Sequence, residues 1–146
     1  MSKPIPEFQH TFHHHTPAQL RFNDIDPLGH VNNTVYFELM DIAKYRYFST
    51  LGGFLDGGPV TAVIVNVNCN FHNQTYLNEN LEVLTAIDVI GEKSITLEQR
   101  VVAVASGEVK CVCRTVMVCF DLEKGTSVEI PADWRKRISA FEERDM

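Results

Sequence analysis

The sequence contains no long apolar run. None of its apolar stretches approaches the roughly 20 residues that a membrane-spanning helix requires. The first 15 residues are polar and rich in histidine, and they lack the apolar segment of a secretory signal peptide. These two absences argue against a membrane protein and a membrane partner, and we expect a cytoplasmic protein.

The chain also lacks an excess of positive charge. It has 13 Lys and Arg residues against 19 Asp and Glu residues, which gives a formal net charge of −6. Proteins that bind nucleic acid or anionic lipid usually present basic surfaces, so neither is an expected partner. A small basic patch for a phosphate-bearing ligand is compatible with this balance, but the sequence has no obvious basic cluster.

Cysteine is scarce, with four residues at positions 69, 111, 113 and 119. In a cytoplasmic protein we expect these cysteines as free thiols. Cys111 and Cys113 are two positions apart and would share one face of a strand, where they are expected to be small buried side chains. A zinc site would need two further ligands nearby. The sequence offers no matching pair, so no metal is predicted.

Internal repeats and linkers are absent as well. The 146 residues are the length of one domain, and a hydrophobic share of 45% is sufficient for a core. We therefore predict a single domain over residues 1–146. The one biased segment is His13-His14-His15, for which vector-derived residues, a solvated strand start and a weak metal trap are alternatives. We favour a solvated run without a metal.

A long helix is predicted from Asn32 or Asn33 to Leu51. Either asparagine is a suitable N-cap, and Gly52-Gly53 would end the helix. One narrow polar stripe runs along it, formed by Thr34, Glu38, Asp41 and Lys44. Because most other positions are apolar, the helix should be buried on most of its sides.

The rest of the chain is rich in β-forming residues. Strands are predicted at 19–23, 63–71, 81–90, 94–105 and 108–121, and a second helix at 132–143. Apolar residues alternate with asparagines along 63–71, which is typical of a strand with one buried face. Short turns at 91–93 and 106–107 favour an antiparallel meander. This order predicts an α+β fold, with one curved antiparallel sheet wrapped around the long helix.

The most informative segment is 24–36, which reads DIDPLGHVNNTVY. It places two carboxylates, one imidazole and two amides just before the start of the predicted helix. A helix N-terminus presents unpaired N–H groups and a positive dipole end, which suit an oxyanion or a polarised carbonyl. A carboxylate beside it can act as a nucleophile or as a general base toward water. One short segment therefore combines both halves of a hydrolytic site.

This segment resembles the D-x-D-x-x-G-H-V-N-N-x-x-Y signature of hotdog-fold thioesterases of the 4-hydroxybenzoyl-CoA thioesterase type. The resemblance covers roughly residues 20–131, and the core of the domain that carries the signature is expected at about 18–131. It implies a hotdog fold and an acyl-CoA thioesterase, which hydrolyses an acyl thioester to a free acid and a thiol. CoA would be part of the substrate, with no separate cofactor. It also implies a homodimer or homotetramer, which the exposed edge of such a sheet favours.

The resemblance assigns catalytic roles to three residues. Asp26 matches the catalytic aspartate, acting as nucleophile or general base. Asn33 matches the helix-start position whose backbone N–H polarises the thioester carbonyl. His30 matches a histidine that is implicated in catalysis in acyl-carrier-protein thioesterases, and a structural role is an equal alternative for it.

Further residues of the signature are expected to bind substrate or shape the site. Gly29 lets the backbone turn close to the ligand, and Asn32 and Tyr36 are the other candidate substrate-binding residues. One of the two asparagines is expected to cap the helix with its side chain, and Tyr36 to pack. Asp24 matches the first aspartate of the signature and is interpreted as an organiser of the loop.

Two departures from the family bear on the substrate. Leu28 stands where carrier-protein thioesterases have an asparagine, which favours CoA as the carrier. Residues 72–81 lack the proline and glycine usual in the family, and this leaves the acyl group open. The alternative function is a non-catalytic hotdog module that binds acyl-CoA or acyl-carrier protein, which the intact Asp26 disfavours. A hotdog dehydratase would need a different pairing of histidine and acid, for which the sequence has no motif.

Overall fold

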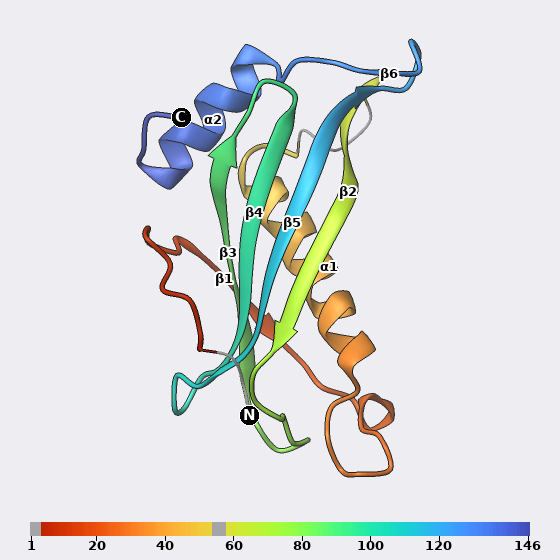
Figure 1. Cartoon of the computed structure of the whole chain (residues 1–146), viewed down its shortest axis with the longest axis vertical. Coiled ribbons are helices and arrows are strands. Elements are labelled where there is room, and N and C mark those ends of the chain that lie inside the picture. Colours follow the sequence, from red (N-terminus) through yellow and green to blue (C-terminus); the bar gives the residue numbers. More distant parts are fainter. Residues whose placement is uncertain (1–3, 54–57) are drawn as a thin grey trace.

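The computed structural model describes residues 4–53 and 58–146 (Figure 1). Its strands are β1 (His14–Ala18), β2 (Val60–Phe71), β3 (Leu81–Ile90), β4 (Ser94–Ala103), β5 (Val109–Asp121) and β6 (Thr126–Ser127). Its helices are the 3-10 turn η1 (Phe22–Asp24), α1 (Asn33–Thr50) and α2 (Ala132–Glu142). Elements therefore follow the predicted order closely from α1 onward.

Within these residues, six strands form one antiparallel sheet. The strand order is β1-β3-β4-β5-β2, and the short β6 pairs with β5. Figure 1 shows α1 lying along one face of this sheet, with α2 at the end where β3 and β4 meet. This arrangement confirms the predicted α+β hotdog fold.

The core lies between α1 and the sheet, in two clusters. Tyr36, Met40 and Ala43, from the first three turns of α1, pack over β3, β4 and β5. Tyr47 and Phe48, from the second half, pack with the apolar side of α2. Among the described residues, neither α-helix is long and apolar enough to cross a membrane.

The opposite side of α1 is not buried. Ile42 is 52% and Tyr45 58% exposed, and Phe37 lies on the same open side. The prediction that α1 is buried on most sides is therefore wrong for the single chain. A single curved sheet covers one side of a helix, and the described part of the chain provides no second layer over the other.

β2 is also more exposed than its alternating sequence indicated. Val65 and Val67 are exposed, although the pattern predicted one buried face. The reason is that β2 forms an edge of the sheet and, among the described strands, pairs only with β5. One face of this strand lies beyond the cover that α1 provides.

The strand predicted at 19–23 is wrong, because β1 lies earlier and η1 occupies Phe22–Asp24. β1 pairs with β3 from His14 opposite Thr85 to Ala18 opposite Leu81. Leu81 is the first residue of β3, so the described part of the chain offers no neighbouring strand to pair with beyond Ala18. Strand β1 thus starts inside the histidine run.

The histidines of the run have partners in the fold. His13 Nε2 lies 3.7 Å from Glu143 Oε2, and His15 Nδ1 lies 3.3 Å from Glu82 Oε1. The ring of His14 packs edge-on against Tyr47. The run is therefore a strand start that contacts β3, α1 and the end of α2.

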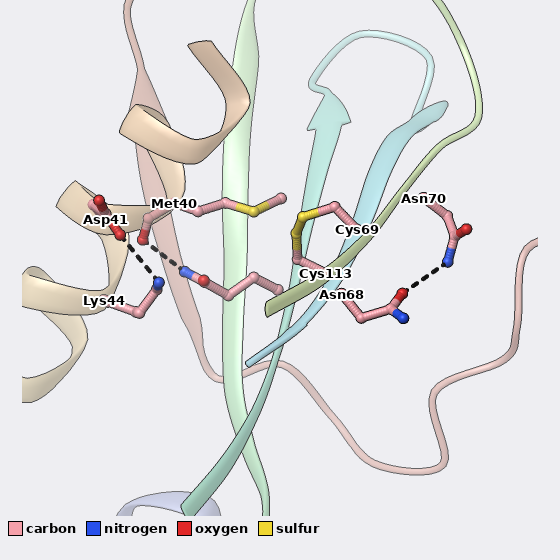
Figure 2. Close-up of a disulfide and its surroundings, with 8 residues drawn as sticks. Met40, Asp41, Lys44, Asn68, Cys69, Asn70 and Cys113 are labelled. Atoms are coloured by element: carbon pink, nitrogen blue, oxygen red, sulfur yellow. Dashed lines mark hydrogen bonds and ion pairs between the residues drawn. A yellow bond between two sulfur atoms is a disulfide. The ribbon is translucent and has the colours of Figure 1, made fainter. Parts of the chain in front are cut away.

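The expectation of four free thiols is wrong for two of the cysteines. Cys69 of β2 and Cys113 of β5 are joined by a disulfide (Figure 2). They are direct cross-strand partners in the β2–β5 register, a relation that 44 residues of sequence separation hide. Cys111 and Cys119 are free thiols as predicted, and both are buried.

Candidate active site

A pocket of about 370 Å³ opens where the loop before α1 meets the loop after β2. Figure 1 shows both loops, in orange and green, at the same end of the molecule. The pocket is lined by Asp26, His30, Val31, Asn33, Tyr36, Phe71, His72, Asn73 and Gln74. It brings four of the predicted site residues together and leaves Gly29 and Asn32 outside its lining.

Asp26 is held in the loop through one of its two carboxylate oxygens. Its Oδ1 accepts hydrogen bonds from the backbone N–H groups of Leu28, at 2.9 Å, and His30, at 3.2 Å. The backbone N–H of Asp26 donates to the carbonyl of His30 at 2.8 Å. None of the described residues donates a hydrogen bond to Oδ2. The loop therefore orients the carboxylate through Oδ1, in a partly exposed side chain that lines the pocket.

Gly29 makes this turn around Asp26 possible. It has a φ of +82°, a backbone conformation that residues with a Cβ rarely adopt. Its N–H donates to the carbonyl of Asp26 at 3.0 Å, which closes the turn. Gly29 thus acts on the shape of the loop and is exposed on its outer side.

The two adjacent asparagines have different positions at the start of α1. Asn32 is the N-cap, and its Oδ1 accepts hydrogen bonds from the backbone N–H and the hydroxyl of Thr34, both at 3.0 Å. Asn33 is the first residue of α1 and lines the pocket. Its backbone N–H belongs to the first turn, where N–H groups have no partner within the helix.

Asp24 is buried beneath the same loop. Its Oδ2 accepts a hydrogen bond from the backbone N–H of Arg21 at 2.7 Å, and the Arg21 side chain reaches Oδ1 at 3.2 Å. The Asp24 carbonyl accepts from the N–H of Asn32 at 2.9 Å. These contacts join the 3-10 turn to the helix start, in keeping with the interpretation of Asp24 as an organiser of the loop.

The loop after β2 is tied to the loop before α1 through Thr75. The Thr75 carbonyl accepts from the N–H of Val31 at 2.8 Å, and its hydroxyl bonds the hydroxyl of Tyr36 at 2.8 Å. Burial raises the pKa of Tyr36, so this hydroxyl keeps its proton at neutral pH. Tyr36 therefore reaches the pocket as a neutral, packed side chain. The same two loops also meet where the ring of His30 packs edge-on against Tyr76, with ring centroids 5.4 Å apart.

Lys110 of β5 holds the same loop from below. Its side chain is only 2% exposed, and its Nζ contacts the Gln74 carbonyl and Glu79 Oε2, each at 2.9 Å, as well as Glu108. Burial opposes the charge of Lys110, but pairing with Glu108 and Glu79 raises its pKa overall. The Lys110 carbonyl also accepts from the N–H of His72 at 2.8 Å. Lys110 thus fixes the pocket wall at several points.

Sequence reasoning missed Thr75 and Lys110. The departures from the family at 72–81 pointed to this loop as a determinant of the substrate but identified no contact in it. A lysine inside an apolar strand was the available signal, because such a side chain is rarely buried without partners. Glu108 is two positions away, but Gln74 and Glu79 belong to a loop more than 30 residues away, which no local pattern reveals.

The segment that forms this pocket is similar to a known protein family. Residues 20–138 match the family model of the thioesterase-like superfamily. The long-chain acyl-CoA thioesterase FadM of Escherichia coli is 23% identical over 125 residues, which cover 84% of this chain and 95% of FadM. The matched range 20–138 contains every residue that lines the pocket.

Solved structures are similar over most of the chain. A thioesterase from Thermus thermophilus, complexed with coenzyme A and Zn, is 30% identical, with a TM-score of 0.80. That alignment covers 92% of this chain and 98% of the Thermus chain. The PA5185 protein of Pseudomonas aeruginosa PAO1 is 26% identical with a TM-score of 0.79, covering 88% and 91% of the two chains. Sequence and fold therefore lead to the same family.

Proposed function

Because the chain belongs to the thioesterase-like superfamily, and is thus a thioester hydrolase, we propose that it hydrolyses an acyl-CoA to a free acid and CoA. Its similarity to the E. coli acyl-CoA thioesterase and to a thioesterase that binds coenzyme A supports this substrate class. The observation that carries the proposal is the geometry of Asp26. Its carboxylate is anchored through Oδ1 and partly exposed, in the same pocket as the N-terminus of α1.

In the proposed reaction, the thioester carbonyl accepts a hydrogen bond from the backbone N–H of Asn33. Asp26 Oδ2 then attacks the carbonyl carbon to form an anhydride that water hydrolyses, or it takes a proton from a water that attacks. Either route ends with the C–S bond broken, the acid released and the CoA sulfur protonated. The helix N-terminus stabilises the oxyanion, and losing one such donor typically lowers the rate by about 10²–10³-fold. The proposed reaction requires no cofactor besides the CoA of the substrate.

His30 is proposed to act chiefly through its backbone. Its N–H donates to Asp26 Oδ1 and its carbonyl accepts from the N–H of Asp26, so the residue shapes the loop whatever its ring does. The ring packs edge-on against Tyr76. These contacts favour the structural role of His30 over a role in proton transfer.

We also propose that the active protein is a homodimer, in which a second chain covers β2 and the open side of α1. These two exposed apolar regions are continuous, because the rings of Phe37 and Phe71 lie 6.3 Å apart. Phe71 lines the pocket, so a chain seated there would help to enclose the substrate. An unpaired edge strand with apolar side chains is a typical site for such pairing. Light scattering should give a molar mass of at least two chains, and a monomer would contradict the proposal.

The first test is thiol release from short, long and aromatic acyl-CoAs. We expect turnover of at least one member, and loss of that turnover in a folded Asp26→Asn protein. Asp133→Asn is the matched control, because this carboxylate lies on α2 and pairs only with Arg137 among the described residues. Binding of acyl-CoA without any turnover would favour the alternative, a non-catalytic binding module. Undiminished turnover in Asp26→Asn would contradict the mechanism.

A further inference from the structure

Three cysteines gather in the core beneath the first half of α1. Cys69 and Cys113 face each other across β2 and β5, and Cys111 lies two positions before Cys113 on the same face of β5. Their sulfur atoms lie within 4.8 Å of one another. Figure 2 shows the Cys69–Cys113 bridge on the side of the sheet toward which the side chain of Met40 points. The sheet register therefore builds a sulfur cluster that belongs to no part of the proposed reaction.

We propose that Cys69 and Cys113 form a reversible dithiol–disulfide pair that a hydroperoxide oxidises. The Cys69 sulfur attacks one peroxide oxygen, which gives a sulfenic acid on Cys69 and, for hydrogen peroxide, releases water. The Cys113 sulfur then attacks the Cys69 sulfur, the S–S bond forms, and a second water leaves. Two electrons pass from the two thiols to the peroxide, and an external dithiol reverses the change.

Burial distinguishes Cys69 from the other three cysteines. Cys69 is half-buried because β2 is an edge strand, whereas Cys111, Cys113 and Cys119 are almost completely buried. Burial raises the pKa of the Cys111 thiol to about 12, so it carries almost no thiolate at neutral pH. Cys69 is thus the sulfur that a peroxide meets first, and Cys113 is its direct partner across the ladder.

The bridge joins the pocket to the sheet. Cys69 lies two positions before Phe71, the last residue of β2, which lines the pocket. β5 carries Lys110, which holds the loop after β2, three positions before Cys113. Oxidation therefore ties the strand that leads into the pocket wall to the strand that supports this wall. The chemistry itself is independent of the proposed hydrolysis.

The test starts from fully reduced protein treated with hydrogen peroxide, which is small enough to reach a half-buried sulfur with a second chain paired on β2. We expect the thiols titrated after denaturation to fall from four to two, as the disulfide and the two free cysteines of the structure require. Digestion should link the peptide with Cys69 to that with Cys113. The midpoint of thermal unfolding should rise by roughly 5–15 °C on oxidation.

Two alanine variants on β5 provide matched controls. Cys111→Ala should still lose two thiols, because it keeps the reactive pair. Cys113→Ala should form no intramolecular bridge and should trap Cys69 as a sulfenic acid, which a dimedone probe detects. Four titratable thiols after treatment of folded wild-type protein would overturn the proposal. A bridge to Cys111 in the wild type would overturn it as well, whether or not the protein hydrolyses acyl-CoA.

Discussion

Each end of α1 lies beside a carboxylate, Asp26 at its start and Glu142 of α2 near its last turns. Asp26 is partly exposed, and backbone N–H groups hold only its Oδ1. Glu142 is buried, and its Oε2 accepts from the hydroxyl of Tyr47 and, at 3.2 Å, from the N–H of Ile87. The same functional group is thus partly exposed at one end of the helix and buried among hydrogen-bond donors at the other.

The pKa values of Glu142 and Tyr47 are consistent with a structural role for this buried pair. Burial raises the pKa of Glu142, with the bonds to Tyr47 and Ile87 acting in the opposite direction. Burial raises the pKa of Tyr47 as well, so its hydroxyl remains a donor. Through its hydrogen bonds to Tyr47 and Ile87, the Glu142 carboxyl group ties α2 to α1 and β3. Asp26 is proposed as the reactive carboxylate because it is partly exposed, whereas burial and hydrogen bonding give Glu142 a structural role.

The largest expected effect is that two variants show opposite defects, one in turnover and the other in stability. Asp26→Asn should lower kcat by about 10²–10⁴-fold and change the free energy of unfolding by less than about 1 kcal/mol. Glu142→Ala should lower the free energy of unfolding by about 2–4 kcal/mol, because it leaves buried donors without an acceptor, and should leave kcat of the folded protein nearly unchanged. Denaturant titration and steady-state kinetics measure both.

Glu143→Ala is the control for the second variant, since the neighbouring carboxylate is largely exposed. It should cost far less stability than Glu142→Ala. Loss of turnover in Glu142→Ala without loss of stability would contradict the structural role assigned to Glu142.

Lys110→Met should disturb the pocket wall and leave the Asp26 side chain unchanged. It removes the bond to the Gln74 carbonyl and leaves Glu79 without its buried partner. We expect kcat/KM to fall by about tenfold, a loss of roughly 1.4 kcal/mol of transition-state stabilisation, mostly through a higher KM. Lys93→Met, in the turn between β3 and β4, is the control. A loss confined to kcat would contradict this positioning role.

Asn32 and Asn33 should separate capping from catalysis. Asn32→Ala removes the acceptor of the Thr34 N–H and should cost about 1 kcal/mol of stability. Asn33→Ala keeps the backbone N–H that is proposed to polarise the carbonyl, so kcat should change less than about threefold, or about 0.6 kcal/mol. A large loss of kcat in Asn33→Ala would assign the role to its side chain instead.

The smallest expected effect is a pH dependence of stability from Glu142. Its pKa is raised in the folded protein above the ordinary value of 4.5, so folding is favoured while this carboxyl is protonated. That stabilisation is complete below the unfolded pKa and lost as pH rises through the folded pKa. Wild-type protein should therefore lose stability relative to Glu142→Gln as pH rises above 4.5. Glu143→Gln should follow the wild type, and a difference that is constant with pH would contradict the interpretation.

Local patterns predicted most of the elements. The strand at 81–90 was predicted to the residue, and α1 to within one residue at its C-terminal end, because periodicity and capping act over a few neighbouring positions. The strand predicted at 19–23 failed for the opposite reason. Whether an extended segment becomes a strand depends on a partner, and β3 begins at Leu81, opposite Ala18. The cytoplasmic location stays a prediction.

The candidate site was predictable where its residues are consecutive. The segment 24–36 identified Asp26, His30, Asn33 and Tyr36, which the structure gathers in one pocket. Thr75 and Lys110 were not identified, because their contacts join segments far apart in the chain. The choice between the two asparagines was also undecided until the cap geometry assigned the side-chain role to Asn32.

The amino-acid sequence by itself determined the fold class, the long helix, the meander and the loop that carries Asp26. Each of these depends on periodicity or on turn chemistry within a short window. Only the tertiary structure decided which strand is the edge, which cysteines meet, and what supports the pocket wall. These features depend on the register between strands that are distant in the chain, and that register is fixed only when the strands pair in the complete sheet.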